Sequence, residues 1–116
     1  MSALKRLLAE GKIEESISSW NSPPFTVPKK FNPIIGKMEY CLVNDFRNLN
    51  TVTRKQIFPL PLLDDVLYRF RGKSVFSTLD FDSGFHQIRI ADESKPKTAF
   101  SLRHGHYQWK VLPMGV

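Results

Sequence analysis

The sequence has few features that could stabilise a protein other than a hydrophobic core. Its 116 residues include one cysteine, Cys41, which excludes an internal disulfide and a zinc site built from cysteines. This cysteine usage is typical of an intracellular protein, cytoplasmic or nuclear. The apolar runs are all much shorter than the ~20 residues of a membrane span. We therefore expect no membrane partner.

The chain also has fewer acidic than basic residues. Seventeen Lys and Arg stand against 11 Asp and Glu, which gives a net charge of +6. Such a balance favours a polyanionic partner. The basic residues are scattered in small clusters along the chain, so folding would have to assemble any binding groove. A hydrophobic fraction of 41% allows one domain with a modest core.

Apolar periodicity and chain breakers predict an α+β fold with mostly antiparallel strands and two or three helices. One helix is expected between a capping Ser2 and a terminating Gly11, and a second over residues 62–70. The strands are predicted from β-branched and aromatic runs. They cover residues 25–27, 39–46, 75–80, 87–90, 98–102 and 106–112.

The most informative stretch is residues 75–88, VFSTLDFDSGFHQI. It leads an apolar run to Asp80, then turns at Ser83 and Gly84 beside the ring of Phe85. A carboxylate at a strand end, free backbone amides in a turn and a flat ring can begin a metal-dependent nucleotide site. The same residues fit a plain hairpin between buried strands. Taken alone, they favour the hairpin.

Five sequence motifs, in order along the chain, shift the preference from a plain hairpin to a nucleotide site. They are WNSPPFTVPKK (20–30), NDFRNLN (44–50), FPLP (58–61), the Asp80 segment, and KTAF (97–100) with GHY (105–107) and LPMG (112–115). Together, at this spacing and over almost the whole chain, they resemble the start of the reverse transcriptase domain of Gypsy-type LTR retrotransposons. The resemblance to retroviral enzymes is more distant.

The resemblance implies a single incomplete reverse transcriptase domain. Residues of about 1–73 would form the N-terminal helix, fingers hairpin and connecting helix, and about 74–116 the first part of the palm. The family adds deoxynucleotide triphosphates to a primer on an RNA or DNA template, with Mg (or Mn) bound only in a complete domain.

The family's Tyr-x-Asp-Asp hairpin has no match in these residues, so the isolated chain is expected to be inactive and to self-associate through the open edge of strand 75–80. The alternative is a non-enzymatic retroelement remnant that binds nucleic acid weakly or needs a partner to fold.

The resemblance assigns roles around the central turn. Asp80 is the first catalytic carboxylate and a metal ligand, and Phe81 offers its backbone carbonyl to the metal. Ser83 and Gly84 present amides to the triphosphate. Phe85 is the ring that excludes a 2′-hydroxyl. A simple turn and core packing are the structural alternatives for these last three.

The fingers and the chain end carry further nucleotide contacts by resemblance. Lys29 and Lys30 reach the triphosphate, although the residues taken alone favour a solvated hairpin tip. Met114 lies under the nucleotide base. Cys41 occupies a position where the family usually has a clamping arginine. Because a thiol cannot replace a bidentate cation, we expect weakened nucleotide binding.

Two more residues match positions that face the template, Asp45 and Arg47, with a surface ion pair as the alternative. Asp82 matches no family ligand and is expected to be solvated. We interpret His86 as a structural residue.

Overall fold

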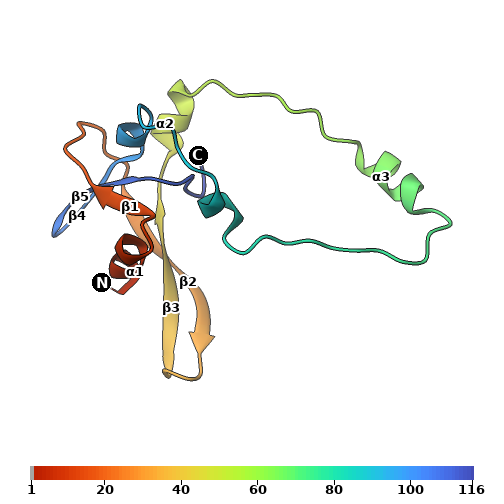
Figure 1. The fold of residues 1–116 in the computed structure, drawn as a ribbon, viewed down its shortest axis with the longest axis horizontal. Helices are drawn as coiled ribbons and strands as arrows, with labels where there is room; N and C mark the ends of the chain where they lie inside the picture. The colour runs from red at the N-terminus through yellow and green to blue at the C-terminus, as the bar shows by residue number, and fades with distance from the viewer. Residues whose placement is uncertain (1) are drawn as a thin grey trace.

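The computed structural model describes residues 2–116, and the side chain of Ser2, our predicted cap, lies outside that description. The elements in order are α1 (Ser2–Ala9), β1 (Ile13–Glu15), β2 (Pro24–Asn32), β3 (Lys37–Asn44), α2 (Arg47–Val52), α3 (Leu63–Phe70), the 3-10 helices η1 (Gly84–Gln87) and η2 (Lys95–Thr98), β4 (Phe100–Leu102) and β5 (Gly105–Trp109). The strands form two antiparallel sheets, β1-β5-β4 and β2-β3 (Figure 1). This confirms the predicted α+β class.

The three-stranded sheet and α1 form the body of the molecule. Successive side chains of a strand alternate between faces, and β5 points Tyr107 and Trp109 inward. Phe100 from β4 is fully buried. Gly11, at φ +70°, ends the α1 turn as predicted. The buried residues that pack together in the core are Leu4, Leu7, Ile13, Leu42, Phe46, Leu49, Phe100, Tyr107 and Trp109.

The β2-β3 hairpin is longer than the sequence predicts and projects away from the body (Figure 1). Its register pairs Pro28 with Tyr40 and Lys30 with Glu39, which leaves Lys29 as the extra residue of a β-bulge. A bulge bends its strand and redirects the side chain at that point.

Residues 54–83, here called the arm, leave the body as an extended loop with α3 near its far end (Figure 1). The Cα radius of gyration is 18.1 Å, against roughly 13 Å for a compact chain of this length. The arm accounts for the larger radius of gyration, because it extends away from the body and its side chains are mostly exposed. Leu79, for example, is 88% exposed.

The predicted strand 75–80 is wrong. That segment is extended but pairs with no strand in the described part of the chain. An apolar, β-branched run becomes a strand only when a neighbour satisfies its backbone groups, and this one has none. The open strand edge that we expected to drive self-association is therefore not formed.

Most of the other predicted helices and strands are present in the structure. Helix 62–70 is confirmed as α3, although none of its residues is buried. The strands expected at 98–102 and 106–112 are confirmed as the shorter β4 and β5, whereas 87–90 is reduced to one bridge between Arg89 and Val111. Strand β1 and helix α2 were not predicted.

The exposed arm predicts a clear hydrogen-exchange pattern. Amides of residues 54–83 should exchange almost as fast as in an unfolded chain, α3 included, because an unpacked helix of 8 residues is marginal in water. Amides of β5 should be the most protected. Mass spectrometry after brief labelling measures both, and slow exchange over 75–80 would contradict the account.

Candidate nucleotide and nucleic-acid site

The turn after Asp80 has a defined and unusual backbone. Ser83 adopts φ +47°, a left-handed conformation uncommon for a residue with a side chain. The amide of His86 donates to the Ser83 carbonyl at 2.9 Å, and Gln87 Nε2 donates to the Asp82 carbonyl at 2.8 Å. Asp80 itself lies exposed at the end of the extended segment. The carboxylate is therefore free to meet a ligand.

Gly84 permits a close approach within this turn. A Cβ at Gly84 would lie 3.3 Å from Cβ of Phe81, tighter than an ordinary contact. The rings of Phe81 and Phe85 are both largely exposed, so core packing does not explain Phe85. The turn thus presents two rings and a left-handed backbone to solvent.

The donors near Asp80 fit a hard divalent cation in kind but not in number. Carboxylate and carbonyl oxygens are the ligands that Mg²⁺ prefers. Residues 2–116, however, gather no group of three or more His, Cys, Asp or Glu side chains that could hold a metal ion. A two-metal centre for nucleotidyl transfer needs more carboxylates than Asp80 and its neighbour Asp82 supply.

The hairpin positions the predicted triphosphate lysines. Lys29 is the unpaired residue of the bulge, and Lys30 lies opposite Glu39. Both lysines are exposed. Cys41 is half-buried on β3, opposite Val27. The thiol therefore lies in the same hairpin as the two lysines but on a paired stretch of strand.

Asp45 and Arg47 form the ion pair given above as the structural alternative. Arg47 Nε and Nη2 donate to the Asp45 carboxylate at 2.9 and 2.7 Å. Hydrogen bonding by Arg47 holds the pKa of the Asp45 carboxyl below its usual value, and the same contact raises the pKa of Arg47. The Arg47 side chain is 89% exposed, so its remaining N–H groups face solvent.

The chain end folds back beside this pair. Asn50 in α2 donates through Nδ2 to the Gly115 carbonyl at 2.7 Å, next to the exposed Met114. A cavity of about 400 Å³ lies where the chain end meets this ion pair. It is lined by Phe25, Asn44, Asp45, Phe46, Arg47, Asn50 and Gly115. The structure therefore brings Asp45 and Arg47 close to the turn that holds Met114. The hairpin with Lys29 and the arm with Asp80 leave the body in different directions (Figure 1).

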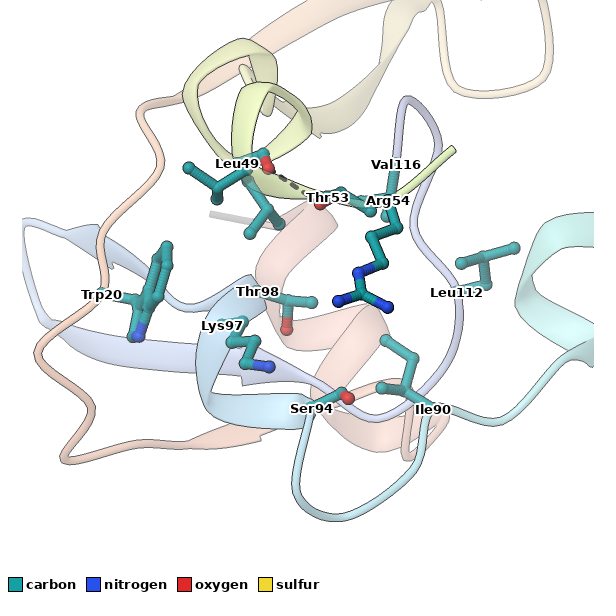
Figure 2. Close-up of a pocket in the computed structure, with 11 residues that line it drawn as sticks. Trp20, Leu49, Thr53, Arg54, Ile90, Ser94, Lys97, Thr98, Leu112 and Val116 are labelled. Atoms are coloured by element: carbon teal, nitrogen blue, oxygen red, sulfur yellow. Dashed lines mark hydrogen bonds between the residues drawn. The ribbon is translucent and has the colours of Figure 1, made fainter. Parts of the chain in front are cut away.

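A second, larger cavity of about 530 Å³ lies between the end of α2, η2 and the C-terminal stretch (Figure 2). Arg54 and Lys97 both point into it, with the Ser94 hydroxyl nearby. Sequence analysis missed this pair. Both residues stand in basic or motif positions, but only the fold shows that they face each other.

Comparison with known proteins identifies the family. A family model described as "Reverse transcriptase (RNA-dependent DNA polymerase)" matches residues 27–116. The chain belongs to the reverse transcriptase family. Among the relatives of this reverse transcriptase chain are the Drosophila melanogaster Pol polyproteins from transposons 297, opus and gypsy, 40%, 42% and 39% identical over 113 residues. The expected resemblance to Gypsy-type elements is confirmed.

Solved structures agree with this assignment. The prototype foamy virus protease-reverse transcriptase matches at a TM-score of 0.76 with 28% identity, over 97% of this chain and 14% of that one. A foamy viral protease-reverse transcriptase in complex with dsDNA matches at 0.74 with 26% identity, over 97% and 22%. The chain covers 97% of its own length in the transposon alignments but only 11% of the 297, opus and gypsy polyproteins.

Within residues 2–116 of this reverse transcriptase chain, no helix has the length and apolar character needed to cross a membrane.

His86 gives the chain a pH-sensitive contact beside the predicted site. Its ring lies 5.5 Å from the buried ring of Trp109, and its Nδ1 has no hydrogen-bond partner. Burial lowers the pKa of His86 below 6.5, and Lys12 lowers it further, while Glu10 acts in the opposite sense. The unfolded chain then binds the proton more readily than the folded chain.

We therefore predict that the free energy of unfolding falls as the pH drops from 6.5 towards the folded pKa of His86. The variant His86→Phe should lose that part of the pH dependence, and His104→Gln, at an exposed position, should keep it. Urea denaturation between pH 5 and 8 measures this. Identical pH profiles for wild type and His86→Phe would contradict it.

Proposed function

We propose that residues of about 1–73 and 74–116 supply the fingers and the first part of the palm of an RNA-directed DNA polymerase. The observation that carries the proposal is the family match over 27–116, which includes all the predicted site residues from Lys29 to Met114. The polymerase would copy nucleic acid inside the cell, in the cytoplasm or nucleus.

The nucleotide would meet groups from three parts of this chain. Lys29 and Lys30 neutralise the triphosphate, and their flexible stems suit a hairpin that projects from the body. The amides around Ser83 and Gly84 donate to phosphate oxygens, which the left-handed backbone at Ser83 supports. Phe85 lies against the sugar, because its exposed ring can exclude a 2′-hydroxyl. Met114 packs against the base.

Asp80 and the carbonyl of Phe81 would contribute oxygen ligands to catalytic Mg or Mn. Such a site requires further carboxylates beside these two donors, so the metal is proposed for a complete domain alone. Of the two metal ions that nucleotidyl transfer uses, one would activate the primer hydroxyl and the other would neutralise the triphosphate.

The nucleic-acid partner would be an RNA or DNA template with its primer. The net charge of +6 supports a polyanion, and a foamy viral relative has been seen in complex with dsDNA. Arg47, whose guanidinium retains free N–H groups outside its bond to Asp45, would contact the template backbone.

A second function suits the 116-residue polypeptide by itself. The exposed arm, and the fact that residues 2–116 gather no group of three or more metal-ligating side chains, favour a non-enzymatic module that binds nucleic acid weakly or folds fully with a partner. Self-association would then proceed through the apolar side chains of the arm, not through a strand edge.

A chimera tests the enzymatic proposal. Residues 1–116 would replace the aligned part of the gypsy Pol polyprotein, 39% identical over 113 residues. We predict primer extension on poly(rA) with oligo(dT), and a loss of at least about a hundredfold in Asp80→Asn, since each 1.36 kcal/mol of lost transition-state stabilisation is about tenfold in rate. The 116-residue polypeptide alone should give no extension.

The matched control is Asp82→Asn in the same chimera. It removes an equal charge two residues away, at a position assigned no ligand role, and should retain most of the activity. Activity that survives Asp80→Asn, or an equal loss in both variants, would overturn the role of Asp80.

A further inference from the structure

We propose that the cavity between Arg54 and Lys97 binds a phosphodiester of single-stranded nucleic acid, with a neighbouring base against Trp20. This Arg54–Lys97 cavity is separate from the positions that the family resemblance assigns. It deepens the proposed function by adding a nucleic-acid contact and rests on that function only for the identity of the partner.

The charge of the cavity selects an anion. Arg54 and Lys97 are exposed, and neither forms an ion pair with a carboxylate in the part of the chain that the structure describes. No Asp or Glu lines the cavity. Figure 2 shows the guanidinium of Arg54 reaching across the hollow towards the ammonium of Lys97 and the hydroxyl of Ser94. Two cations and a hydroxyl suit a phosphate.

The apolar walls of the cavity favour a ligand that carries a flat apolar group in addition to a phosphate. Trp20, Leu49, Ile90 and Leu112 give it apolar sides. Trp20 is 42% exposed, so its ring can receive a flat partner. Base stacking on aromatic rings beside a basic groove is how proteins hold single strands without reading sequence. The volume of about 530 Å³ lies within the usual range for ligand sites.

A neighbouring cavity favours a strand over a free nucleotide. It measures about 390 Å³, shares Ile90 with the first, and its charged lining residues are Arg89, Lys95, Lys110 and one carboxylate, Asp92. Lys95 is paired with Asp92 at 2.6 Å, which leaves Arg89 and Lys110 as its available cations. Two adjoining cavities with basic side chains match successive phosphates along one strand, which are separated by sugars, better than the directly linked phosphates of one nucleoside triphosphate.

The backbone that carries Lys97 is fixed to the body. Thr98 Oγ1 donates to the Lys95 carbonyl at 2.7 Å and accepts from the Trp109 amide at 3.0 Å, which holds η2 against β5. Thr53 Oγ1 donates to the Leu49 carbonyl at 2.8 Å and closes α2 just before Arg54, the first residue of the arm. The Lys97 side of the cavity is therefore formed before any ligand arrives, and Arg54 completes it from the start of the arm.

Fluorescence anisotropy with a labelled oligo(dT) of about 12 nucleotides, within the site sizes of single-strand binders, tests the proposal on the whole 116-residue chain. The double variant Arg54→Gln/Lys97→Gln should bind at least about tenfold more weakly. Its slope of log K against log salt should be shallower by about 0.7 for each lost phosphate contact. The matched control, Arg71→Gln/Lys73→Gln, removes the same charge from the arm and should bind within about twofold of wild type.

Equal losses in the two double variants would overturn the proposal, because they would reflect net charge alone. Arg54→Lys/Lys97→Arg keeps both charges and guards against a folding defect. It should bind within a few-fold of wild type, and tenfold weaker binding by a folded, charge-retaining variant would also count against a phosphate site.

Tryptophan fluorescence of the unmodified chain provides an independent readout. Trp109 is 2% exposed, so quenching by oligo(dT) should come from Trp20 and disappear in Trp20→Phe. Inorganic phosphate at the same phosphate concentration should neither quench nor displace the oligonucleotide. If it does both, the cavity is a simple anion site and the strand assignment is wrong. The anisotropy and quenching measurements need no primer extension, so failure here is distinguishable from failure of the polymerase proposal.

Discussion

A buried hydrogen bond from Trp109 Nε1 to Asn44 Oδ1, 2.9 Å long, joins the two sheets, and the rest of the structure depends on it. Asn44 Nδ2 in turn donates to the Ser22 carbonyl, and the Ser22 amide donates to the Ala99 carbonyl. A buried polar group that loses its partner costs about 1–3 kcal/mol. This connection therefore sets where the β2-β3 hairpin leaves the body, and with it the position of Lys29.

The same anchor places Asp45 and Arg47, the residues predicted to face the template. Asn44 ends β3, Asp45 donates its amide to the Pro23 carbonyl at 2.8 Å, and α2 starts at Arg47. Helix α2 then runs from the predicted template contact Arg47 to Val52, two residues before Arg54 at the edge of the larger cavity. One short helix thus connects the site inferred from family resemblance with the site inferred from the fold.

Sequence signals predicted the helices and strands that are stabilised by interactions between residues close together in the chain. Gly11 and the apolar side of α3 marked their elements, because caps and periodicity act within a few residues. Strand 75–80 failed because its apolar pattern describes burial against a partner that residues 2–116 do not provide. Motifs located Asp80, yet the bulge at Lys29 depends on the register between β2 and β3, and the position of Arg54 and Lys97 around one cavity depends on long-range packing.

The central claim is that the turn after Asp80 receives a deoxynucleotide against the ring of Phe85. The most direct measurement is the ratio of dTTP to UTP incorporation by the gypsy chimera with Phe85 or with Phe85→Ala. We expect the ratio to fall at least about tenfold, a loss of about 1.4 kcal/mol of discrimination, with dTTP incorporation largely kept. An unchanged ratio in an active Phe85→Ala chimera would contradict the account.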